Sequence, residues 1–233
     1  MNGGGWAEFA VAWAVFLLSH VLPARPAVRR RLAAALGERG YLVGYGVVSV
    51  AALTWLIVAS GRAPYVSLWP PAAWQVWLAN LAMPLACLLI AFAVGAPNPL
   101  SFGGRAAGFD PRRPGVAGVA RHPLLVALAL WASVDTLANG DLAHVLLFGG
   151  FAGFALSGMR ALDRRRRRQL GEAEWARLAA CTSDWPLAAL LAGRWRPRPA
   201  RPDAARLVLG LLLWLGLLAL HPVVIGVSPL PPA

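Results

Sequence analysis

The chain has 233 residues, of which 58% are hydrophobic and 14% are charged. A soluble domain carries about 25% charged residues, so this composition excludes an ordinary soluble fold and predicts an all-α bundle in a lipid bilayer. All 22 basic residues are arginine and the net charge is +12. These arginines lie between the apolar runs, where membrane topology accounts for them without nucleic acid as a partner.

Six apolar runs approach the roughly 20 residues that cross a bilayer. They cover 6–22, 41–60, 77–94, two helices of a hairpin within 123–159, and 207–227. The hairpin begins at Pro123, which loses no hydrogen bond in a first helical turn. Its turn, Ala138-Asn139-Gly140-Asp141, combines residues tolerant of left-handed geometry with an N-cap carboxylate, Asp141, for the second helix. The first run lacks a basic n-region and a cleavage site, so we expect a retained helix.

The arginines predict the orientation. The loops after the first, third and fifth helices hold five, four and twelve of them, which is 21 of the 22. The positive-inside rule assigns these loops to the cytoplasm, and six helices then put both termini on the outer, periplasmic side. We therefore expect a single transmembrane domain over 1–233 that contains a basic cytoplasmic loop at 160–206. Within this loop, 170–178 is either a short helix with Trp175 and Leu178 in the membrane interface or a solvated connector.

Two of the four histidines share one depth in this topology. His20 ends the first helix and His122 begins the fourth, both at the cytoplasmic side, whereas His144 lies at the outer end and His221 about 22 Å above the inner end of its helix. Two neutral imidazoles that face each other across a bundle are a known way to hold haem iron. The alternative is that His20 hydrogen-bonds a carbonyl and His122 caps a helix or binds lipid.

The other ionisable residues and the known catalytic motifs give weaker support for a functional site. No carboxylate is expected beside the two histidines, so a zinc site lacks ligands. Arg25 and Arg121, near the cytoplasmic face, could pair with haem propionates. Asp135 lies deep in the fourth helix and needs a partner, such as Arg62, Thr136 or water. No GxSxG, Walker or HExxH motif is present, and the two cysteines have no metal or haem-attachment spacing.

Several segments together resemble the NnrU family of bacterial membrane proteins nearly end to end. They are Ser19-His20-Val21-Leu22-Pro23, Leu36-Gly37-Glu38-Arg39-Gly40-Tyr41, Arg121-His122-Pro123-Leu124-Leu125, Leu137-Ala138-Asn139-Gly140-Asp141-Leu142, Leu147-Phe148-Gly149-Gly150-Phe151, His221-Pro222 and Gly226-Val227-Ser228-Pro229-Leu230-Pro231. The resemblance implies a multi-pass protein of the bacterial inner membrane. It also makes Asp135, Asn139, Asp141 and His221 secondary candidates for a site.

The family is similar to 15-cis-zeta-carotene isomerase, an integral-membrane haem b enzyme that isomerises a carotenoid double bond without net redox change. Carried over, the two haem ligands of that enzyme fall on His20 and His122. The resemblance thus implies haem b as cofactor and a hydrophobic polyene as substrate. Family members often carry a histidine before the Leu-Ala-Asn-Gly-Asp turn, where this chain has Asp135, which puts any role of that histidine in doubt here.

Two further functions stay open. Bacterial NnrU proteins are associated with nitrite and nitric oxide metabolism in denitrification, which implies an accessory, non-catalytic role. The Arg-His-Pro motif with acidic residues in a later loop also loosely resembles isoprenylcysteine-type membrane methyltransferases. Those enzymes usually carry a tyrosine after the motif, where this chain has Leu124 and Leu125.

Overall fold

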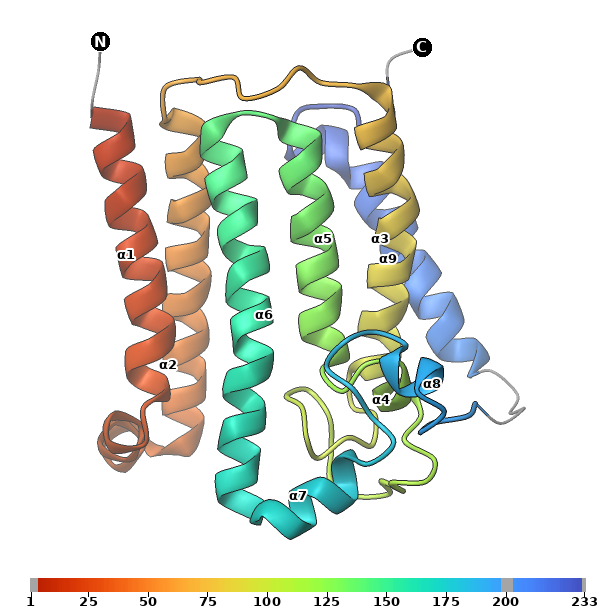
Figure 1. Cartoon of the computed structure of the whole chain (residues 1–233). Coiled ribbons are helices and arrows are strands. Elements are labelled where there is room, and N and C mark those ends of the chain that lie inside the picture. The colour runs from red at the N-terminus through yellow and green to blue at the C-terminus, as the bar shows by residue number, and fades with distance from the viewer. Residues whose placement is uncertain (1–3, 198–202, 232–233) are drawn as a thin grey trace. The chain divides into compact units, whose positions relative to one another are not determined.

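The computed structural model describes residues 4–197 and 203–231, which form helices and loops and no β-strand beyond two isolated bridges. The predicted all-α fold is confirmed (Figure 1). The helices are α1 (Gly4–Ala24), α2 (Pro26–Arg62), α3 (Ala73–Ala93), α4 (Val116–Val119), α5 (Pro123–Asn139), α6 (Leu142–Leu170), α7 (Glu172–Ala179), α8 (Ala188–Leu191) and α9 (Ala204–Val224).

Within the described residues, five helices are long and apolar enough to cross a membrane: α1, α2, α3, α6 and α9. The 17-residue α5 is apolar but shorter, and these six helices match the six predicted runs. Large apolar side chains point away from the protein, as at Val43 (67% exposed), Leu81 (69%) and Val223 (80%). Such surfaces are stable in lipid rather than water. The chain is therefore a multi-pass membrane protein.

Two helices extend into segments that were predicted to be loops. α2 begins at Pro26, and its basic first part is separated from the apolar part at Gly37, whose φ of 72° and ψ of 160° are not helical. α6 continues beyond residue 159 through the five consecutive arginines. Arginine and leucine favour helix and no proline or glycine intervenes. The helix ends where Gly171 takes a φ of 81°, a common C-terminal signal.

The chain divides into two compact units, one of residues 1–69 and 140–147 and one of residues 70–139 and 148–233. In the first unit, α1 and α2 pack along each other. The Tyr41 hydroxyl donates to the Pro23 carbonyl at 3.1 Å, and Glu8 accepts from both Trp55 and Arg62. The predicted turn is also present, with Gly140 at a φ of 63° and its carbonyl accepting from the Leu68 amide at 2.8 Å.

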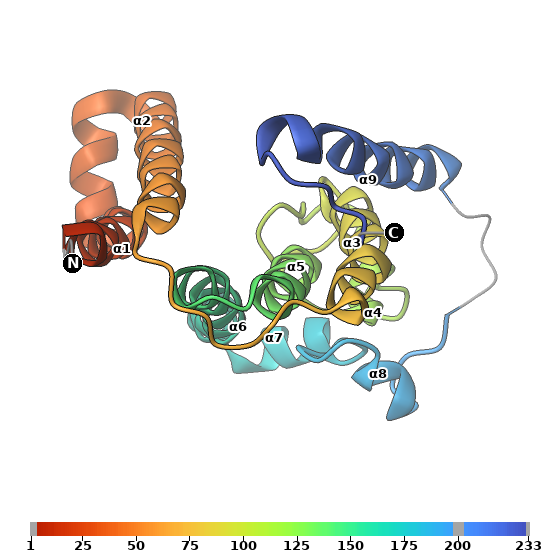
Figure 2. The same ribbon diagram turned by 90° about the horizontal axis from the view of Figure 1, so that it is seen from above.

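In the second unit α3 lies between α5 and α9 (Figure 2). α5 packs on α6 through Val126 and Ala129, which form one apolar cluster with Ala155 and Met159. The short helices α4, α7 and α8 gather with their loops at one end of the unit (Figure 1). This end holds most of the polar side chains discussed below.

The predicted short helix at 170–178 forms as α7. Its Trp175 and Leu178 are each only 7% exposed and pack with Ala179 against Leu100. The prediction that these two side chains lie in the membrane interface is therefore wrong. They anchor the basic segment to the protein instead, because burying two large apolar side chains together is worth several kcal/mol, at about 1.5–3 kcal/mol each.

Glycine allows α9 to approach α3 closely. A Cβ atom at Gly210 would lie 3.1 Å from the Leu88 Cα and 3.3 Å from the Ala91 Cβ, whereas one at Gly216 on the same helix would meet nothing within 4 Å. Close helix approach at small residues is a general feature of membrane bundles. Gly210 thus sets the α3–α9 contact.

We predict that Gly210→Ala lowers the stability of the detergent-purified protein by about 1–2 kcal/mol, because the extra methyl group overpacks this contact. Gly216→Ala adds the same methyl group in open space and should be neutral or slightly stabilising, since alanine favours helix. Thermal unfolding followed by circular dichroism measures both. Equal melting temperatures for the two variants would contradict the assignment.

Candidate functional site

Arg121 and His122, directly before α5, are the buried polar centre of the second unit. Arg121 is 8% exposed and His122 is fully buried. The Arg121 guanidinium forms ion pairs with Asp163 of α6 and, at 2.9 Å, with Asp184 of the loop after α7. Its Nε donates to the Thr182 hydroxyl at 2.9 Å. One cation thereby joins the start of α5, the end of α6 and the loop after α7.

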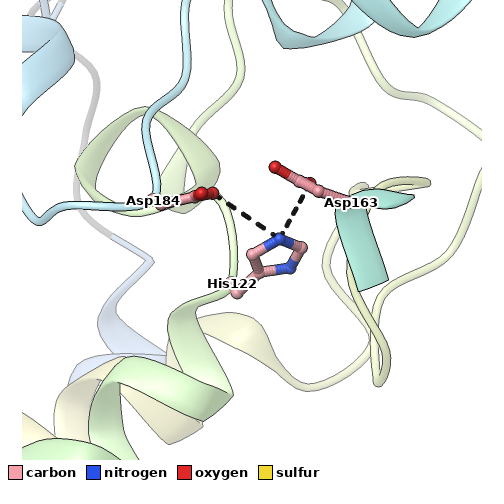
Figure 3. Close-up of side chains that lie close together, drawn as sticks. All are labelled: His122, Asp163 and Asp184. Atoms are coloured by element: carbon pink, nitrogen blue, oxygen red, sulfur yellow. Dashed lines mark hydrogen bonds and ion pairs between the residues drawn. The ribbon is translucent and has the colours of Figure 1, made fainter. Parts of the chain in front are cut away.

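His122 faces the same two carboxylates (Figure 3). Its Nε2 lies 3.0 Å from Asp163 Oδ1 and 3.8 Å from Asp184 Oδ1. Since a carboxylate accepts hydrogen bonds, Nε2 carries the proton and, in the neutral ring, Nδ1 carries the lone pair. Nδ1 is buried and has no hydrogen-bond partner. A ring that donates from one nitrogen to a carboxylate and leaves the other uncommitted has the arrangement of a metal-ligating histidine.

The local sequence and the neighbouring loops fix this position. Proline at 123 disfavours helix at His122 and starts α5. The Arg121 amide donates to the Ser183 carbonyl at 2.7 Å, and the Arg121 carbonyl accepts from the Asn98 side chain at 2.9 Å. The Arg121 guanidinium also lies 5.0 Å from the centre of the Trp175 ring, a cation–π distance.

The cluster is electrically close to balance. One guanidinium and two carboxylates leave one negative charge while His122 is neutral. Burial raises the pKa of Asp184 above its usual value, and the nearby Asp163 carboxylate adds to this effect against the opposing charge of Arg121. Ligand atoms of His122, Asp163 and Asp184 lie within 4.8 Å of one another. The arrangement can therefore hold a proton or a cation beside His122, although Arg121 already supplies one positive charge there.

These carboxylates overturn the expectation that His122 has none beside it. Asp163 and Asp184 were missed because both come from segment 160–206, where arginines outnumber acids and any acid has a surface partner at hand. The one available signal was that each is an isolated acid in a basic segment. The other two acids nearby, Glu172 and Glu174, pair instead with exposed arginines, Arg167 at 3.5 Å and Arg177 at 2.7 Å.

His20 and Arg25 belong to the other unit. The His20 Nδ1 lies 2.7 Å from the Phe16 carbonyl oxygen, and its ring packs on Phe16 and Tyr45. Because a carbonyl only accepts, Nδ1 is the protonated nitrogen and the neutral ring has its lone pair on Nε2. Arg25 is the exposed N-cap residue of α2. The pairing of His20 with His122 stays a prediction.

One secondary candidate, Asp141, belongs to the first unit, and the other three belong to the second. Asp141 caps α6 as predicted, accepting from the His144 amide at 3.2 Å, and also binds the His144 ring at 2.7 Å. Asp135 interacts electrostatically with His221 of α9. Of its predicted partners, Thr136 donates its hydroxyl to the Ala132 carbonyl and Arg62 pairs with Glu8. Asn139 is exposed and donates to the Asp135 carbonyl.

A cavity of about 1390 Å³ lies beside the cluster in the second unit. Leu85 and Leu88 of α3, Leu130 of α5 and Leu156 of α6 line it, and Asp184 lies at its polar end. No sequence pattern predicts this cavity, because it arises from packing of helices that are distant in sequence. Ligand pockets usually measure about 300–1,000 Å³, so this one admits a lipid-sized molecule.

We predict that Asp163→Asn destabilises the protein by about 3–5 kcal/mol, because it leaves the buried Arg121 charge short of a partner. Glu174→Gln is the matched control, since it removes a carboxylate from an exposed pair with Arg177 and should not change the melting temperature measurably. Thermal unfolding of both proteins in detergent is the measurement. A melting temperature for Asp163→Asn equal to that of the control would show that the buried pair does not support the fold.

Comparison with known proteins agrees with this architecture. The family description "NnrU protein" matches residues 8–229, nearly the whole chain. No curated protein and no solved structure matches it. Since the match covers both units, including His20 and the Arg121–His122–Pro123 motif, the chain belongs to the NnrU family.

Proposed function

We propose that this NnrU-family protein binds haem b through His20 and His122 in the bacterial inner membrane and isomerises a hydrophobic polyene. The observation that carries the proposal is the state of His122. Its ring is fully buried, one nitrogen is held by Asp163, and the other has no hydrogen-bond partner. A buried polar atom without a partner costs about 1–3 kcal/mol, which a ligand bond would offset.

Each of the two histidine rings is oriented by a hydrogen bond, as is usual for histidines that bind a metal. Asp163 orients the His122 ring and holds its proton on Nε2. The Phe16 carbonyl accepts from His20 Nδ1 and orients that ring in the same way. Because His122 has no exposed surface, binding at Nδ1 requires the side chains that cover it to move. Haem iron, when reduced, would supply an electron-rich centre that weakens a cis double bond on contact.

The same ligands serve the accessory role in nitrite and nitric oxide metabolism, because haem iron also binds nitric oxide. In that case the protein handles or senses haem or nitric oxide rather than transforming a polyene. Asp163 would still position His122, and the cofactor test below applies equally. An assay of polyene isomerisation by the haem-containing protein then distinguishes the isomerase from the accessory role.

The cofactor is tested by absorption spectra of the detergent-purified full chain, oxidised and dithionite-reduced. We expect a Soret band and sharp reduced α and β bands, absent from His20→Ala and from His122→Ala. His144→Ala is the control and should keep the spectrum, since His144 pairs with the α6 cap. Circular dichroism establishes that each variant is folded. A colourless wild-type protein, even after expression with added haem, would refute haem binding.

One observation favours a second candidate, a membrane methyltransferase. The Arg-His-Pro motif meets an acid from a later loop, Asp184, at the edge of a large apolar cavity. A methyl group would pass from the sulfonium of S-adenosylmethionine to a nucleophile that loses a proton. Against it, arginines crowd the polar end of the cavity and disfavour a cationic cofactor. Equilibrium dialysis with S-adenosylmethionine should show no binding, and saturable binding lost in Asp184→Asn would reverse this ranking.

A further inference from the structure

We propose that the cavity in the second unit binds an anionic amphiphile with a phosphate monoester or diphosphate headgroup and a hydrocarbon chain. Four arginines line its polar end, namely Arg112, Arg113, Arg160 and Arg196. An uncharged polyene has no use for these charges, so the proposed isomerase activity does not explain them. The proposal concerns a binding site separate from His122, which does not line the cavity.

The four guanidinium groups are available for a ligand. No ion pair joins any of them to a carboxylate of the residues that the structure describes. The two acids that line the cavity are engaged elsewhere, Asp184 by Arg121 and Asp203 by Arg206. The polar end therefore carries a concentration of uncompensated positive charge. Arginine binds phosphate through paired hydrogen bonds.

The rest of the cavity is apolar. Its lining includes Leu85, Leu88 and Phe92 on α3, Leu130 on α5 and Met159 on α6. Phe92 lies seven positions after Leu85, which corresponds to a rise of about 10 Å along the helix. A ligand must therefore combine a strongly anionic group with a hydrocarbon chain. A phosphate monoester carries about 1.5 to 2 negative charges at neutral pH, which matches four arginines better than a neutral or zwitterionic headgroup does.

Two tryptophans mark the level of the headgroup. Trp185 and Trp195 line the cavity beside the arginines, and tryptophan prefers the depth of lipid headgroups. Gly118 on α4 fixes Trp195, because a Cβ atom there would lie only 2.4 Å from the Trp195 ring. Basic pockets between membrane helices are a recognised way to bind anionic lipid headgroups.

The test is equilibrium binding of dioleoylphosphatidic acid to the full chain in detergent, compared with dioleoylphosphatidylcholine, which has the same chains. We expect phosphatidic acid to bind at least tenfold more tightly. Arg113→Gln combined with Arg196→Gln should weaken it on the order of 100-fold, because two charge-assisted contacts are lost. Arg164 and Arg165 are exposed like the cavity arginines but lie outside the cavity. Arg164→Gln combined with Arg165→Gln therefore removes the same charge and should leave affinity within about twofold.

Ser133→Phe tests the apolar part, since Ser133 lines the cavity and a phenyl ring there would occupy space that the hydrocarbon chain needs. We expect this variant to lose phosphatidic acid binding while all four arginines remain. Equal binding of the two lipids, equal losses from both arginine pairs, or unchanged affinity in Ser133→Phe would each overturn the proposal. Loss of a Soret band in the Arg113→Gln, Arg196→Gln protein would also overturn it, since the arginines would then hold haem propionates. A colourless protein that still binds phosphatidic acid would refute only the haem proposal.

Discussion

The architecture of the second unit depends on neutralising one buried guanidinium. Transfer of an unpaired charge into a medium of low dielectric constant costs far more than a typical protein's stability. Arg121 is tolerated because Asp163, Asp184 and Thr182 surround it and the Trp175 ring lies beside it. These partners come from three segments, namely α6, α7 and the loop after α7. α6 must therefore extend beyond its apolar part, and the loop after α7 must fold back, before Arg121 can be buried.

Local chemistry made part of this fold predictable. The apolar runs gave the six principal helices, Pro123 marked the start of α5, and Gly140 with Asp141 marked the turn into α6. The cluster around His122 was not predictable in this way. Its ion pairs join residues 42 and 63 positions apart, and no periodicity or motif records which acid will meet which arginine. The same holds for the cavity, whose walls come from α3, α4, α5 and α6 and from the loops beside them.

Asp184 connects the two features that suggest function. Its carboxylate is shared between Arg121 and His122 on one side and lines the cavity on the other. A charged ligand in the cavity would change the potential at Asp184 and, through it, the balance of charge at His122. Occupancy of the cavity and the charge on Asp184 would then be thermodynamically linked, and such linkage is reciprocal.

The length of α5 has a consequence for where the protein can reside. Its 17 residues span about 26 Å at 1.5 Å per residue, while a typical hydrocarbon core is about 30 Å thick. The helix that begins at the Arg121–His122 cluster is thus at the short end of the roughly 17–25 residues that span a bilayer. A thicker bilayer would bring the ionic cluster closer to the hydrocarbon, at a cost that a thinner bilayer avoids.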